Sequence, residues 1–204
     1  MNTKSNTRNL VVLALMTALI FVLQFVTVPL GAITVSLSMI PVAVTAITLG
    51  PVYGCVAGAI WGLASLLKAV TGTSGMTTTL FNIDAFRTIL LCFVPRMLDG
   101  YLLGWIFRLF HKVCKLPVIL SGAIVGFASA FLNTLFFMST LAFLFYNTEY
   151  FQGMLGGKNV VVFICGIIAG NAIFEMLTAT VITGPIAAAL SKARLVPGKV
   201  QAAL

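Results

Sequence analysis

The chain has 204 residues, of which 60% are hydrophobic and only 8% are charged, and its mean hydropathy is +1.13. Soluble domains carry about 25% charged residues, so this composition excludes an ordinary soluble protein and predicts an integral membrane protein. The formal net charge of +8 does not indicate nucleic-acid binding, because no basic stripe alternates with aromatic residues. Basic residues of membrane proteins instead gather in cytoplasmic loops.

The apolar pattern predicts an all-α integral membrane protein with six transmembrane helices in one domain, 1–204. A helix needs about 20 apolar residues to cross a bilayer. The first segment extends past a typical signal-peptide core and lacks a clear cleavage site, so we expect it to be retained. The second segment is too short to cross upright. The predicted helices lie at about 9–28, 37–49, 52–70, 84–108, 116–146 and 159–190, with an uncharged loop at 29–36 and a polar loop at 71–79.

The distribution of basic residues predicts the orientation. Eight of the twelve Lys and Arg residues lie in the N-terminal segment, the 108–115 loop and the C-terminal tail. With six crossings these three regions share one side of the membrane. The positive-inside rule makes that side the cytoplasm, so both termini are expected there.

The fourth predicted helix carries two charged residues, Arg96 and Asp99, well inside an apolar stretch and directly after Pro95. A charge at the bilayer centre costs roughly 2.5–3.5 kcal/mol on insertion scales, so it must face a partner, a cavity or a ligand. Arg96 could pair with Asp99, three residues away, or with Glu175. Alternatively it contacts a ligand, and the sequence leaves both readings open.

Depth along the helices predicts where polar side chains meet. At about 1.5 Å per residue, the candidates in four helices lie about 14–20 Å from the outer ends, and Glu175 lies one turn deeper. A ligand pocket needs apolar walls with a few placed polar groups. Instead of contacting a ligand, Trp61 could serve only in packing, and Asn133 and Asn171 could form hydrogen bonds between helices. The predicted substrate-binding residues are Trp61, Asn82 (which opens the fourth stretch), Arg96, Asn133, Asn171 and Glu175.

No motif predicts an enzyme, a metal site or a cofactor in this chain. The sequence has no P-loop, no G-x-G-x-x-G and no H-E-x-x-H. Ser74 lies in a Gly-Thr-Ser-Gly stretch like that of intramembrane serine proteases, but His111, the single histidine, is expected on the opposite side. A serine nucleophile needs a neighbouring base. The four cysteines show no C-x-x-C spacing, so neither disulfides nor metal ligands are predicted.

Several features together resemble a known family. They are six helices with both ends inside, Ala14-x-x-x-Ala18 in the first helix, and a short second helix that ends in Leu-Gly-Pro-Val-Tyr-Gly at 49–54. The chain thus resembles the substrate-binding S components of energy-coupling factor (ECF) vitamin transporters of bacterial cell membranes. Ile40-Pro41 and the Pro-Arg-Met-Leu-x-Gly stretch at 95–100 look most like the pantothenate-specific members.

The resemblance implies a binding subunit that captures a water-soluble vitamin from outside the cell. It also implies partners: a transmembrane coupling subunit and two ATPase subunits, which hold the ATP and Mg²⁺. Small residues that match Ala14 and Ala18 form part of the docking surface in this family. The S component is thought to topple in the membrane and so carry its pocket inward.

Two alternatives remain at this point. Asp99 and Glu175 could neutralise Arg96 and suit another vitamin, such as hydroxymethylpyrimidine or riboflavin, with Trp61 as a stacking surface. The chain could also be a stand-alone secondary transporter, although six helices without a clear inverted repeat argue against this.

Overall fold

The computed structural model describes residues 3–25, 28–30, 33–35, 37–167, 173–193 and 195–196. These residues form a helical bundle with one short antiparallel hairpin, β1 (Val28–Leu30) and β2 (Ile33–Val35). A π-helical turn, η1 (Leu109–Val113), follows the fifth helix. The helices are α1 (Thr3–Phe25), α2 (Met39–Leu49), α3 (Pro51–Val70), α4 (Gly75–Ile83), α5 (Ala85–Arg108), α6 (Val118–Phe145), α7 (Glu149–Leu155), α8 (Val160–Ile167) and α9 (Ile173–Lys192).

Five described segments are long and apolar enough to cross a membrane, and the helical membrane class is confirmed in that form. They lie in α1, α3, α5 with η1, α6 and α9. The short second helix is present as α2, which has 11 residues. A sixth crossing therefore stays a prediction.

The first helix was predicted at about 9–28, whereas α1 begins at Thr3 and ends at Phe25, and Val28 belongs to β1. Four other predicted helices differ little from the described ones, and the loops differ more. α2, α3, α5 and α6 begin and end within two residues of their predicted ranges. The predicted loop at 29–36 contains the hairpin, and the predicted polar loop at 71–79 already contains the start of α4. α4 and α5 stay separate because Asp84 has an extended backbone and its carboxylate accepts the N–H of Arg87 at 3.0 Å, which starts a new helix.

The predicted helix at 159–190 is described as two elements, α8 and α9, with 168–172 outside the described residues. Gly166, a poor helix former, lies in the last turn of α8. Glu175 lies in the first turn of α9, where the helix dipole favours an acidic residue. The membrane-spanning candidate is therefore α9 alone.

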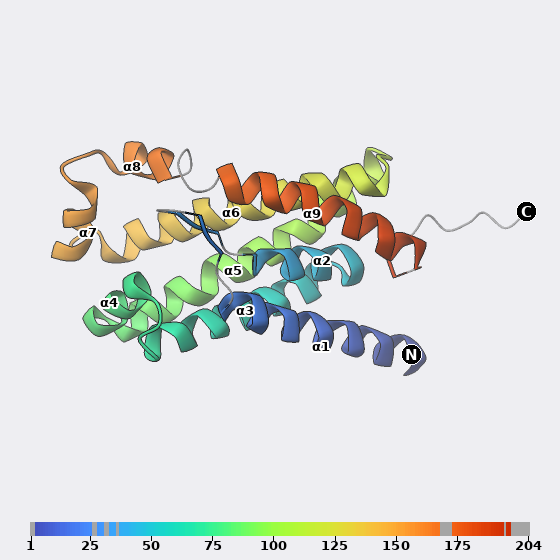
Figure 1. Cartoon of the computed structure of the whole chain (residues 1–204), viewed down its shortest axis with the longest axis horizontal. Helices are drawn as coiled ribbons and strands as arrows, with labels where there is room; N and C mark the ends of the chain where they lie inside the picture. The colour runs from blue at the N-terminus through green and yellow to red at the C-terminus, as the bar shows by residue number, and fades with distance from the viewer. Residues whose placement is uncertain are drawn as a thin grey trace, which may run out of the picture.

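Figure 1 shows how the ends of the bundle are arranged. The start of α1 and the end of α9 lie at the same end, together with the turn between α5 and α6. The short helices α4, α7 and α8 gather at the other end. The described parts of the three basic regions thus share one end, and its assignment to the cytoplasm stays a prediction.

Glycines bring α3 and α5 into very close contact. A Cβ at Gly54 or Gly58 would collide with the backbone carbonyls of Gly100 and Arg96, and one at Gly62 would lie 2.8 Å from the carbonyl oxygen of Cys92. Small residues at every fourth position allow helix backbones to approach in this way. This stripe fixes the register of α3 against the middle of α5.

A second glycine stripe joins α6 to α9. A Cβ at Gly122 would lie 2.6 Å from the Cβ of Ala187, and one at Gly126 would collide with the carbonyl of Ala179. Two of the small-residue stripes in the sequence are therefore internal packing surfaces. They hold two helix pairs, and α5 and α6 pack on each other between them.

Replacing Gly58 with alanine should separate α3 from α5. Its methyl group would meet backbone atoms, which cannot move aside as a side chain can, so we expect a loss of about 1–3 kcal/mol in the free energy of unfolding. Thermal unfolding of the detergent-purified variant measures this. Gly153→Ala in α7 is the matched control, because nothing lies within 4 Å of its added methyl. Equal melting temperatures for the two variants would contradict the close approach.

Candidate functional site

Arg96 is the centre of a buried group of side chains in the middle of the bundle. Its side chain is only 8% exposed. The guanidinium carbon lies 4.9 Å from the ring centre of Trp61 on α3 and 5.4 Å from that of Phe137 on α6. The charge is therefore held between two aromatic rings from different helices.

The hydrogen-bonding capacity of Arg96 is only partly used. Nη1 donates to the carbonyl oxygen of Cys92 in the same helix at 2.9 Å. Nε is buried and has no hydrogen-bond partner among the residues that the structure describes. A guanidinium offers five N–H donors, so several remain for a ligand.

No ion pair between Asp99 and Arg96 is seen among the described residues. Arg87 and Asp84, near the start of α5, do form one, with 3.1 Å between Nε and Oδ2. Asp99 is fully buried, and neither carboxylate oxygen has a hydrogen-bond partner among the described residues. The direct Arg96–Asp99 ion pair, one of the two pairings that the sequence left open, is therefore not observed among the described residues. Both side chains are buried one helical turn apart, and each has hydrogen-bonding atoms without a partner among the described residues.

Asn133 lies on the same side of α6 as Phe137, one turn earlier. Its Oδ1 is buried and without a hydrogen-bond partner among the described side chains and backbone. Ala130, one turn earlier on α6, packs in the same core cluster as Trp61. Trp61 and Arg96 thus meet as predicted, whereas the convergence of Asn133 with them stays a prediction.

The other predicted site residues are placed differently. Asn82 is exposed near the end of α4, at the end of the bundle, so the structure does not bring it to Arg96. Asn82 opens the predicted fourth stretch, and no depth in the middle layer was predicted for it. Glu175 is 8% exposed in the first turn of α9, next to Met176, which packs in the core cluster of Trp61. Asn171 lies outside the described residues.

Gln24 and Phe137 also belong to this group, and the sequence reasoning missed both. Trp61 Nε1 donates to Oε1 of Gln24 at 2.9 Å, and Nε2 of Gln24 donates to Oγ of Ser65 at 3.1 Å. A lone amide near the end of the apolar first helix was the available signal for Gln24. Phe137 carries no sequence signal that separates it from the neighbouring Phe136.

A separate cavity of about 770 Å³ lies between α6, α8 and α9. Apart from the thiol of Cys165, its lining side chains are apolar, with Phe131 and Met176 among them. A polar vitamin would find few hydrogen-bonding partners there, so the group around Arg96 is the better candidate site.

Comparison with known proteins identifies the family of the chain. The family model described as "ECF transporter, substrate-specific component" matches residues 8–187. A pantothenate transporter PanT of Leuconostoc mesenteroides is 30% identical over 167 residues, which cover 78% of each chain. A pantothenic acid transporter PanT of Lactococcus lactis is 27% identical over 210 residues, 94% of this chain and 97% of the relative.

The fold also matches a solved structure. ThiT from Listeria monocytogenes superposes with a TM-score of 0.65 at 17% sequence identity, and the match covers 92% of this chain and 97% of ThiT. At this identity the likeness shows the fold alone.

Replacing Asp99 with asparagine tests whether this acid is the structural counter-ion of Arg96. Because the two do not pair in the described geometry, we expect the unfolding temperature of the ligand-free protein to stay level or rise. Breaking a buried pair would instead cost about 3–5 kcal/mol. Asp84→Asn is the control at the start of the same helix, since it keeps an N-cap oxygen and breaks only the partly exposed pair with Arg87, which is worth at most about 1 kcal/mol. A much larger loss for Asp99→Asn than for Asp84→Asn would restore the ion-pair reading.

Proposed function

The chain belongs to the substrate-specific components of ECF transporters, and we propose that its substrate is pantothenate, captured from outside the cell. Delivery inward would require a transmembrane coupling subunit and two ATPase subunits that bind ATP and Mg²⁺. Two relatives that carry the name of pantothenate transporters support the choice of substrate. In this proposal the chain binds the vitamin and carries it across the membrane, and ATP hydrolysis by the partner subunits supplies the energy.

The observation that carries the proposal is the incompletely satisfied charge of Arg96. A cation–π contact with a desolvated ring is worth about 2 kcal/mol. Removing a cation from water costs several kcal/mol even after relaxation, so the rings of Trp61 and Phe137 offset only part of that cost. A ligand carboxylate would supply the missing partner, because a guanidinium binds a carboxylate through two parallel N–H donors.

The chemistry of pantothenate suits the remaining groups. Its carboxylate would lie against Arg96, and Oδ1 of Asn133 would accept from its amide or one of its two hydroxyls. The rings of Trp61 and Phe137 exclude water from the charge pair, which strengthens it. Asn171 and Glu175 remain proposed contacts, and Asn82 is not one of them because it is exposed near the end of α4.

The proposed docking surface lies on α1. Ala14 and Ala18 are both exposed, and their neighbours Val11, Leu15 and Val22 are 58–63% exposed. Figure 1 shows α1 along one edge of the bundle. A coupling subunit could therefore approach this face closely without displacing another helix.

Asp99 favours a second candidate. Its buried carboxylate would accept hydrogen bonds from a ligand with amino or ring N–H donors. Another vitamin, such as hydroxymethylpyrimidine or riboflavin, would use this acid together with the flat surface of Trp61.

A thermal-shift screen against water-soluble vitamins tests the substrate. Pantothenate at 100 to 1,000 times its dissociation constant should stabilise the detergent-purified protein by about 3–4 kcal/mol. Stabilisation by a different vitamin would replace pantothenate and favour the candidate based on Asp99. If no vitamin had an effect, liposome flux by the chain alone would test the stand-alone transporter.

Arg96→Ala should remove the carboxylate contact while leaving a folded protein. We expect a loss of roughly 2–5 kcal/mol in pantothenate binding, as for one half of a buried charge pair. Isothermal titration calorimetry measures it. Arg108→Ala, at the far end of the same helix, should bind as the wild type does. Unchanged affinity in Arg96→Ala would refute the assignment of Arg96 to the ligand.

A further inference from the structure

Gln24 joins α1 to the group around Arg96 through its side chain. Its Oε1 accepts the indole N–H of Trp61 at 2.9 Å, and its Nε2 donates to Ser65 at 3.1 Å. Trp61 and Ser65 are four residues apart on α3, so one amide spans a full helical turn. Both partners are at most 4% exposed. This amide therefore fixes its own orientation and that of the indole together.

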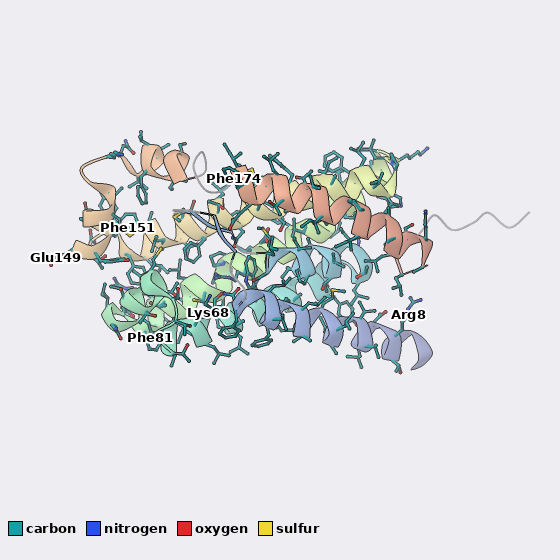
Figure 2. The ribbon with its side chains drawn as sticks, in the orientation of Figure 1. Arg8, Lys68, Phe81, Glu149, Phe151 and Phe174 are labelled. Atoms are coloured by element: carbon teal, nitrogen blue, oxygen red, sulfur yellow. The ribbon has the colours of Figure 1, made fainter. Side chains whose placement is uncertain are left out.

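The backbone of Gln24 is held as well. Its carbonyl is among the last four of α1, which lack partners within a helix. Nζ of Lys68 donates to this carbonyl at 3.0 Å and lies 5.9 Å from the ring centre of Phe25. A cation at a helix C-terminus is favourable. Figure 2 shows Lys68 at the end of α1 opposite Arg8.

The plane of the Trp61 indole decides which surface Arg96 meets. The guanidinium lies over the face of the indole ring at 4.9 Å. Rotation of the indole would present its positive edge to the cation in place of its negative face, which turns attraction into repulsion. The hydrogen bond from Trp61 to Gln24 opposes this rotation, so Gln24 would act on Arg96 through the indole.

We propose that Gln24 is a positioning residue of the ligand site, which holds the Trp61 indole from the end of α1 and so sets the placement of the Arg96 guanidinium. This inference rests on the proposed function, because its effect is measured as vitamin affinity. α1 also carries the exposed Ala14 and Ala18. A partner bound at Ala14 and Ala18 would therefore contact the same helix whose Gln24 holds the Trp61 indole.

The test uses the full chain with Trp105 replaced by phenylalanine, so that Trp61 is the single remaining tryptophan. Gln24→Met keeps the side-chain length and removes the amide. We expect the emission of Trp61 in the ligand-free variant to shift to shorter wavelength, because its N–H loses its acceptor. We also expect the pantothenate dissociation constant to rise about tenfold, as for the loss of one buried hydrogen bond. Thr17→Val, two turns earlier on α1, is the control and should change neither value.

A double-mutant cycle in the parent chain separates positioning from general destabilisation. Trp61→Phe keeps an aromatic face for Arg96 and lacks the N–H. If Gln24 acts through that N–H, combining Trp61→Phe with Gln24→Met weakens binding no further than the stronger single change. Additive losses would overturn the proposal. If Gln24→Met does not fold, Ser65→Ala releases the other end of the amide and should weaken binding about threefold.

The outcomes distinguish this inference from the function on which it rests. A parent protein that binds another vitamin refutes the choice of pantothenate, and the same variants are then titrated with that vitamin. A parent protein that binds no vitamin overturns both proposals. A parent protein that binds, with a Gln24→Met variant that binds equally or emits equally, overturns the role of Gln24 alone.

Discussion

The close approach of α3 and α5 is the constraint on which the rest of the described structure depends. Three glycines spaced four residues apart, Gly54, Gly58 and Gly62, place the α3 backbone directly against that of α5. Neither helix can slide or rotate without bringing backbone atoms into collision. In a bilayer, where no hydrophobic effect drives helices together, such contact packing is a main source of association.

This register places the ring of Trp61 over the guanidinium of Arg96, which is the central contact of the candidate site. A cation between two rings, with Nε free and no acid paired to it in the described chain, is a poor arrangement for stability alone. It is a good one for an anionic ligand, because the desolvation cost is met before the ligand arrives. This arrangement supports the proposal of a preorganised binding site over that of a structural ion pair.

The sequence could place the proposed central residues in one middle layer because depth along a helix depends only on residue number. Trp61, Arg96 and Asn133 follow from the rise per residue and from the cost of a charge in lipid. Asn82 does not join them, since α4 ends as a separate short helix before the Asp84 cap. Gln24 was missed because its importance comes from a contact between α1 and α3, and rotation about a helix axis is not fixed by depth.

Composition alone determined that the chain lives in a membrane, because 60% hydrophobic and 8% charged residues cannot form a soluble surface. The spacing of small residues in the sequence predicted tightly packed helix pairs, and the short sequence motifs indicated the family. Only the tertiary structure decided which stripes face which helices, that Asp99 does not pair with Arg96, and that an amide on α1 holds Trp61. Those features depend on the relative rotation of helices, which is set by packing of all neighbours at once.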